Sequence, residues 1–136
     1  VSKTANTDIW QYHTEAFDTL LLMMNGIGLV ETIQGLRNFL RYAKTLISDS
    51  GQVLLDSSDI AYLYDESHPY PKDKYYGEIR YQYEYKGRRG TWFGWLYADQ
   101  ETLFNIAAQE GWLMQVIYEN DDDQYLARLI MTDKRL

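Results

Sequence analysis

The sequence predicts an α/β fold of three layers, with helices on both faces of a mixed sheet. The unbroken apolar run at residues 20–24 is typical of a strand buried on both faces, because an alternating strand needs only every second residue apolar. A helical pattern at 31–48 and a second apolar strand at 52–57 complete a parallel crossover unit. Two strand-like segments at 112–119 and 124–132 flank a polar turn and predict a closing antiparallel hairpin.

Length, charge and cysteine content set outer limits on the class of protein. The chain has 136 residues, with 13 Lys plus Arg against 20 Asp plus Glu, for a net charge of -7. This balance disfavours binding to nucleic acid or to anionic membranes. The absence of cysteine excludes disulfides, thiolate catalysis and sulfur-ligated metals. No signal peptide or transmembrane run is found, so we expect a soluble, cytoplasmic protein. The sequence begins without Met, which indicates a processed chain or a fragment.

The first strand ends at the dipeptide Asn25-Gly26. A buried helix could carry the same apolar run, but its shortness and this stop favour a strand. Ligands of open α/β sheets bind at the carboxyl ends of the strands, so residues 25–28 are the favoured place for a site. The alternative is an ordinary turn. Upstream, residues 1–16 are polar, with a short strand expected at residues 8–10.

The crossover helix and the second strand follow this turn. Apolar residues recur at spacings of three and four and mark one helix face, and Gly51 is expected to cap the helix: Ile33, Leu36, Leu40, Ala43 and Ile47. The strand at 52–57 ends at Asp56, in a segment that reads either as the N-cap of a following helix or as part of a substrate site.

The second half contains an aromatic hairpin at residues 76–97. Residues 78–85 alternate aromatic or apolar side chains with charged or amide ones, "KGRRG" turns the chain and "TWFGWLYA" returns it. Isolated two-stranded ribbons are marginal in water, so the aromatic face is expected to cover the strand ends or to pack on a second copy. Asp99 is expected to cap a final helix that runs to about Glu110 and ends at Gly111.

This order of elements resembles the C-terminal part of a class I S-adenosylmethionine-dependent methyltransferase. The resemblance rests on "FDTLLL" (17–22) as fourth strand, "NGIG" (25–28) leaving it, the helix at 36–47, "GQVLLD" (51–56) as fifth strand, and the final helix and hairpin. It implies a Rossmann-like fold over one partial domain, residues 1–136, with the aromatic hairpin inserted after the fifth strand. It further implies S-adenosylmethionine as cofactor, a small-molecule acceptor and a substrate-facing role for the hairpin.

The sequence departs from the family in its cofactor elements. It contains no loop of the type Asp-x-Gly-x-Gly-x-Gly and no acid placed to close a second strand. The resemblance therefore implies part of a longer enzyme, inactive alone. It assigns Asp8 to the adenine amino group, Ile9 to the adenine ring, and Asn25 and Gly26 to the floor beside the transferred methyl. Asp8 reads equally well as a turn acid.

Candidates for the chemistry itself are weaker. Asp56, Tyr62 and Tyr70 are candidate substrate contacts, and His68 is a candidate general base, although a surface role fits it as well. No metal site is expected, because His13 and His68 have no partner at ligand spacing. "ENDDD" at 119–123 lacks the glycine and closing glutamate of an EF-hand loop and reads as a solvated turn.

Two classes of function remain open. One is the methyltransferase; the other is a non-catalytic binding module that kept the scaffold and lost the cofactor loop. In the resembled fold a first strand lies beside the fourth. Without it, residues 18–24 would present an unpaired apolar edge, so we expect a homodimer.

Overall fold

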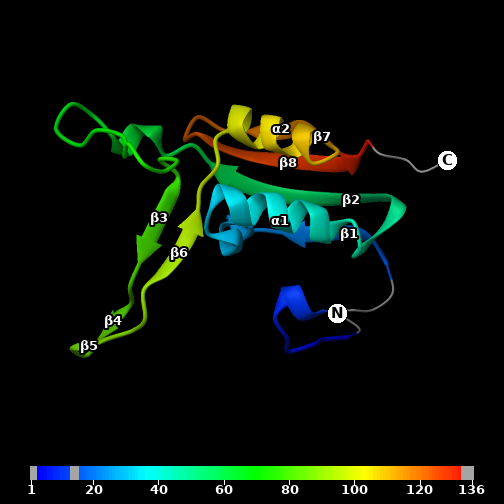
Figure 1. The fold of residues 1–136 in the computed structure, drawn as a ribbon, viewed down its shortest axis with the longest axis horizontal. Coiled ribbons are helices and arrows are strands. Elements are labelled where there is room, and N and C mark those ends of the chain that lie inside the picture. Colours follow the sequence, from blue (N-terminus) through cyan, green and yellow to red (C-terminus); the bar gives the residue numbers. More distant parts are fainter. Residues whose placement is uncertain (1–2, 13–15, 133–136) are drawn as a thin grey trace.

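A computed structural model describes residues 3–12 and 16–132. Its centre is a four-stranded sheet in the order β1 (Phe17–Leu22), β2 (Ile47–Ser58), β8 (Gln124–Met131) and β7 (Trp112–Glu119) (Figure 1). β1 and β2 are parallel, whereas β2 pairs antiparallel with β8, and β8 with β7. The prediction of an α/β fold with a mixed sheet and an antiparallel C-terminal hairpin is confirmed.

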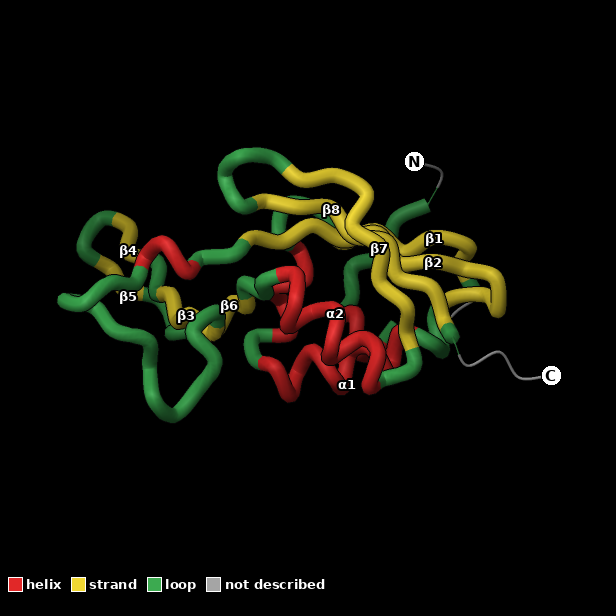
Figure 2. The backbone as a smooth tube through the Cα atoms, turned by 90° about the horizontal axis from the view of Figure 1, so that it is seen from above, coloured by secondary structure: helices red, strands yellow, loops and turns green. Residues whose placement is uncertain are grey.

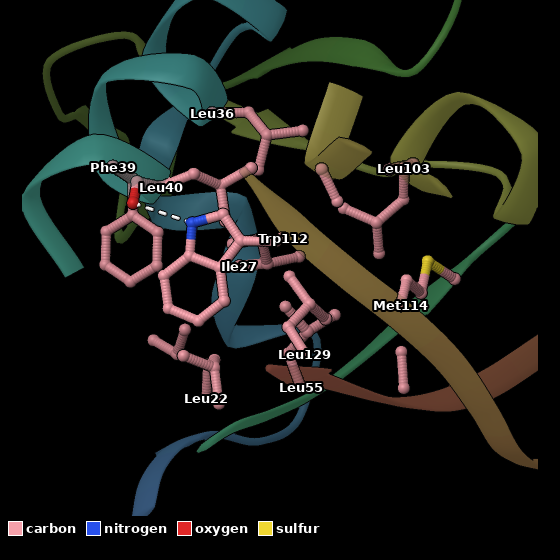
Figure 3. Close-up of a cluster of buried hydrophobic side chains, with 14 of the residues drawn as sticks. Leu22, Ile27, Leu36, Phe39, Leu40, Leu55, Leu103, Trp112, Met114 and Leu129 are labelled. Carbon is pink, nitrogen blue, oxygen red and sulfur yellow. Dashed lines mark hydrogen bonds between the residues drawn. The ribbon is translucent and has the colours of Figure 1, made fainter. Parts of the chain in front are cut away.

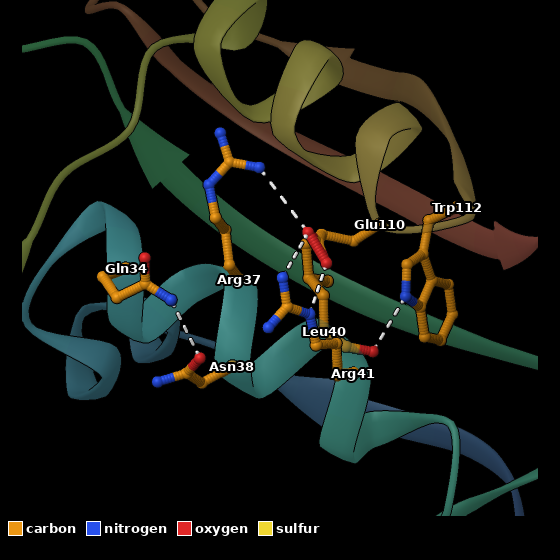
Figure 4. A network of polar contacts seen from close by, with 7 residues as sticks. All are labelled: Gln34, Arg37, Asn38, Leu40, Arg41, Glu110 and Trp112. Carbon is orange, nitrogen blue, oxygen red and sulfur yellow. Dashed lines mark hydrogen bonds and ion pairs between the residues drawn. The ribbon is translucent and has the colours of Figure 1, made fainter.

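Two α-helices pack on one face of this sheet (Figure 2). Helix α1 (Ile33–Ala43) begins after Thr32, whose hydroxyl accepts a hydrogen bond from the Gly35 amide. Helix α2 (Gln100–Gln109) begins after Asp99, as the sequence predicted, and the Asp99 carboxylate accepts from the Thr102 amide. These caps satisfy amides that have no partner inside the helix. The helices are joined at the Glu110 carboxylate, which accepts from Arg41 at 2.6 Å (Figure 4).

The core lies between the helices and the sheet (Figure 3). Along β2, Val53, Leu55 and Ser57 are buried and face the helices, while the alternate residues are only partly covered. Trp112 fills the centre, and its indole N–H donates to the Leu40 carbonyl at 2.9 Å. This bond satisfies a polar group that would otherwise be costly to bury.

The opposite face of the sheet carries no helix within the described residues (Figure 2). The expectation that residues 20–24 are buried on both faces is therefore wrong for the chain as described: Leu22 is buried, but Leu21 is 60% exposed and Met24 90% exposed. The physical reason is position, because β1 is an edge strand with β2 as its only neighbour among the described strands.

Three local expectations are corrected. The helix expected at 31–48 ends at Ala43, and β2 already begins at Ile47, which pairs with Phe17. Gly51 is accordingly a buried residue inside β2 and not a helix cap. Ile47 is β-branched, which favours a strand. It follows Ala43 by four residues, so in the sequence it continues the apolar spacing of the helix. The segment at Asp8 forms a 3-10 helix, η1 (Ile9–Gln11), instead of a strand, because the Asp8 carboxylate accepts from the Trp10 amide.

The aromatic hairpin is present as a long ribbon that projects away from the sheet (Figure 1). β3 (Glu78–Tyr81) pairs with β6 (Phe93–Leu96), and the short strands β4 (Glu84–Tyr85) and β5 (Arg88–Arg89) form its tip. Tyr83 and Tyr85 near the tip are 76% and 72% exposed. The ribbon therefore covers the body of the protein only at its root.

Candidate functional site

The loop that leaves the carboxyl end of β1 lies beside the carboxyl end of the parallel strand β2. Met24 and Asn25 both have positive φ angles, 59° and 55°, and the 3-10 helix η2 (Gly26–Val30) follows. The Asn25 amide donates to the Asp56 carboxylate of β2 at 2.8 Å. Three residues predicted from the sequence, Asn25, Gly26 and Asp56, are thus brought together at the edge where α/β sheets bind ligands.

The side chain of Asn25 has one satisfied and one unsatisfied end. Its Nδ2 donates to the Leu96 carbonyl at 3.0 Å, while its Oδ1 is buried and has no hydrogen-bond partner. No other described side chain has a buried nitrogen or oxygen in this condition. An unsatisfied buried acceptor costs about 1–3 kcal/mol, so this oxygen suits a ligand that brings an N–H or O–H group.

The root of the ribbon packs directly on this loop. A Cβ added to Gly28 would lie within 2.0 Å of the Trp95 indole nitrogen, so only glycine lets the ring approach so closely. The Gly94 amide also donates to the Glu31 carboxylate at 2.9 Å. Sequence reasoning did not anticipate these contacts, although the second glycine of "NGIG" was a signal of close approach.

One face of the ribbon forms a groove of about 310 Å³. It is lined by five aromatic residues and one amide: Tyr81, Gln82, Tyr83, Phe93, Trp95 and Tyr97. The Tyr81 and Tyr97 hydroxyls lie 3.0 Å apart. Burial, as the larger cause, and the hydrogen bond with Tyr81, as the next, raise the pKa of Tyr97 to about 12, so the Tyr97 hydroxyl stays protonated near neutral pH.

Beyond β2, tyrosines and acids hold the ribbon and α2 together. Tyr76 donates to the Asp59 carboxylate at 2.6 Å, and Tyr75 donates to the Asp99 carboxylate at 2.5 Å. Burial and this bond raise the pKa of Tyr75 above its usual range. Burial opposes ionisation of Asp99, but hydrogen bonds from Thr102 and Tyr75 outweigh it and lower the pKa of that carboxyl. These hydrogen bonds join parts of the fold to one another, so we assign Tyr75, Tyr76 and Asp99 a structural role.

The weaker candidates lie in the connection that follows β2. The single turn η3 (Ala61–Leu63) lies there, where the sequence left a longer helix open, and the Asp59 carboxylate accepts from the Ala61 amide at its start. Tyr62 is 68% exposed, and the Tyr70 ring stacks on that of Tyr76 with centroids 4.9 Å apart. His68 is exposed and lies 3.5 Å from the Asp65 carboxylate. None of these three candidates has a hydrogen bond to residues 25–28 in the described structure.

The two N-terminal candidates lie elsewhere. Ile9 lines a shallow hollow with Phe17 and Leu46, at the amino end of β1, and the neighbouring Trp10 packs on Phe39 of α1. Asn25 follows the opposite, carboxyl end of that strand. The structure thus does not bring Asp8 and Ile9 to Asn25 and Gly26. His13 lies outside the described residues.

Comparisons with known proteins point to methyltransferases. No family model and no curated protein matches the sequence. A crystal structure of a SAM-dependent methyltransferase from Bacteroides fragilis with S-adenosyl-L-homocysteine is 38% identical, with a TM-score of 0.79 over 89% of this chain and 50% of that one. The DhpI complex with the same ligand is 11% identical (TM-score 0.64, 95% and 54% coverage), and CcbJ methyltransferase from Streptomyces caelestis is 9% identical (0.58, 93% and 60%).

The sheet, its helices and these likenesses define the fold as Rossmann-like, of the methyltransferase type. The chain is similar to the C-terminal part of class I S-adenosylmethionine-dependent methyltransferases, as its sequence predicted. It spans about half the length of the structures it matches. The DhpI and CcbJ structures, at their low identity, support the fold alone.

Proposed function

We propose that the chain is part of an S-adenosylmethionine-dependent methyltransferase that methylates a small-molecule acceptor. The observation that carries this proposal is the 38% identity, over 89% of the chain, to a methyltransferase that binds S-adenosyl-L-homocysteine. Identity at this level extends beyond shared architecture.

The residues present fit one edge of a cofactor site. Asn25 Oδ1 is a buried acceptor in need of a donor, and Gly26 adds no side chain beside it. The sequence supplies no glycine-rich loop and no acid for ribose hydroxyls. In this proposal the main cradle for the cofactor therefore belongs to another part of the protein, and this chain supplies the floor.

The chain's own contribution to catalysis is then positioning. When bound, S-adenosylmethionine supplies an activated methyl group. Asn25 and Asp56 fix the loop at the carboxyl ends of β1 and β2, and the ribbon root shields it from one side. Holding an acceptor in line and excluding water accounts for much of the rate enhancement in such reactions. We assign no general base, since His68 is exposed and its side chain pairs with Asp65, not with a residue of the loop at 25–28.

The location and the partners of the protein are part of the same proposal. No helix of the described residues is long and apolar enough to cross a membrane. We propose a cytoplasmic enzyme that acts without nucleic acid or membrane. The net charge of -7 favours this assignment over one that depends on phosphate backbones. The homodimer is proposed for the 136-residue chain, in which β1 has only β2 as a neighbour among the described strands.

The proposal is tested by S-adenosylmethionine binding to the complete gene product and to its Asn25→Gly variant. Glycine keeps the positive φ of Asn25 and removes its side-chain amide, including the hydrogen bond from Nδ2 to the Leu96 carbonyl. Losing one buried hydrogen bond should weaken binding about ten-fold. Asn38→Ala, at an exposed site on α1, is the matched control and should bind like the parent protein.

Two results would count against the proposal. If the complete gene product fails to bind the cofactor, the non-catalytic module becomes the better account. If it binds and Asn25→Gly binds equally well, the methyltransferase stands but Asn25 has no role in its floor.

A further inference from the structure

We infer that the aromatic groove of the ribbon is the acceptor site and that it selects a flat, uncharged aromatic acceptor with a polar substituent. This inference rests on the proposed function and names the substrate class for the same site. It concerns the six residues that line the groove, of which Trp95 also contacts the strand-end loop.

The walls of the groove are made of ring faces and edges. Phe93 lies with its ring centroid 5.9 Å from that of Tyr81 and 5.2 Å from that of Tyr83, both pairs tilted. Tyr83 is 76% exposed, so one of its faces is free. Aromatic walls favour a planar ring over a saturated one, because stacking adds to the burial of apolar area.

The polar groups of the groove are few and uncharged. They are the paired hydroxyls of Tyr81 and Tyr97, the Tyr83 hydroxyl, the Trp95 indole N–H and the Gln82 amide. The Gln82 nitrogen already donates to the Gly90 carbonyl. No lysine, arginine, aspartate or glutamate lines the groove. A charged ligand would lose hydration there without gaining a counter-ion, so the acceptor is uncharged, with a hydroxyl or similar group to meet the tyrosine pair.

Position connects the groove to the candidate cofactor floor. The Trp95 ring forms part of the groove wall and packs on Gly28, three residues after Asn25. The Gly94–Glu31 bond fixes the same part of the ribbon to the loop. A volume of about 310 Å³ is at the small end for ligand sites, which range over roughly 300–1,000 Å³, and suits a molecule of one or two fused rings.

Calorimetric titration of the complete gene product tests the inference, with 2-naphthol as a flat probe that carries one hydroxyl. Its saturated counterpart, decahydro-2-naphthol, has the same substituent without the flat ring. We expect the saturated probe to bind about ten-fold more weakly. Tyr83→Leu should weaken 2-naphthol binding by a similar factor, and Tyr97→Phe by a few-fold through loss of the hydroxyl. Tyr85→Leu, at the exposed tip outside the groove, is the control and should bind like the parent protein.

The outcomes separate this inference from the proposed function, because S-adenosylmethionine is titrated into the same samples. If the cofactor binds and 2-naphthol does not, the groove is not the acceptor site, while the proposed methyltransferase function stands. Binding of 2-naphthol without cofactor binding supports an aromatic site and overturns the methyltransferase. Equal affinity for both probes, or no effect of Tyr83→Leu in a variant with unchanged melting temperature, overturns the aromatic selectivity.

Discussion

At the scale of single residues, the closest packing in the candidate site is between Gly28 and Trp95. The indole ring occupies the space that a Cβ on residue 28 would need. Asn25, three residues earlier, combines a left-handed backbone with an amide bonded to Leu96. These two residues fix how the ribbon leaves the body of the protein, so small changes here should alter both stability and the groove.

Gly28→Ala should destabilise the protein by about 1–3 kcal/mol, because the added methyl group would overlap the Trp95 indole and force it to move. Urea denaturation followed by circular dichroism measures this change. Gly90→Ala is the matched control: its added Cβ would meet its nearest atom at 3.6 Å, an ordinary contact, and stability should change by less than about 0.5 kcal/mol. Equal stability of both variants would show that Trp95 does not pack closely on Gly28.

At the scale of elements, α1 and α2 are held together by apolar burial and by the two ion pairs of the Glu110 carboxylate. The Glu110 carboxylate accepts from Arg41 at 2.6 and 3.2 Å and lies 3.5 Å from Arg37 (Figure 4). The hydrogen bond from Arg41 lowers the pKa of Glu110 below its usual range. A carboxyl whose pKa is lowered by folding stabilises the protein above its unfolded pKa, near 4.3, and this contribution is lost as pH falls through the folded value.

Glu110→Gln should therefore reduce stability at neutral pH and lessen its loss on acidification from about pH 6 to pH 3. The parent and the variant should become similar at the acidic end. Denaturant titrations at several pH values measure the slope. Arg41→Met should have a comparable effect, and the double variant should be less destabilised than the sum of the two. Strictly additive losses would mean that Glu110 and Arg41 do not interact.

Elements differ in how well the sequence predicts them. The strands at 112–119 and 124–131, and the helix after Asp99, follow from alternation, turn residues and a cap that act locally. The end of α1 was placed too late, since Ile47 belongs to β2, where it pairs with Phe17 of β1, and is buried in the core from that strand. Asn25 and Asp56 were predictable because parallel strands end at one edge. The meeting of Trp95 with Gly28 was not, because it depends on the direction of a ribbon that no local pattern encodes.

At the scale of the whole molecule, one face of the sheet carries no helix among the described residues, and β1 and β7 are its two edge strands. β1 pairs with β2 alone, and Leu21 is 60% exposed on the face opposite the helices. An apolar edge strand with unpaired backbone groups tends to pair with another chain. A two-fold dimer is the commonest closed arrangement that satisfies both copies.

Leu21→Lys should shift the 136-residue chain from dimer to monomer, because a lysine on an edge strand opposes pairing. Sedimentation equilibrium should show the dissociation constant rising at least about ten-fold. Phe104→Lys, at an exposed site on α2, makes the same change of charge and also removes an exposed apolar side chain, and it should leave the dimer intact. If the unsubstituted 136-residue chain is monomeric at high concentration, the expectation of a homodimer is wrong.

The central claim is that this chain carries the floor of a methyltransferase site whose main cofactor cradle lies elsewhere in the protein. Calorimetric titration of S-adenosylmethionine into the 136-residue chain and into the complete gene product tests it most directly. We predict micromolar binding by the complete product and none tighter than about 1 mM by the 136 residues alone. Micromolar binding by the short chain would contradict the claim, since Asn25, Gly26 and their neighbours would then suffice to hold the cofactor.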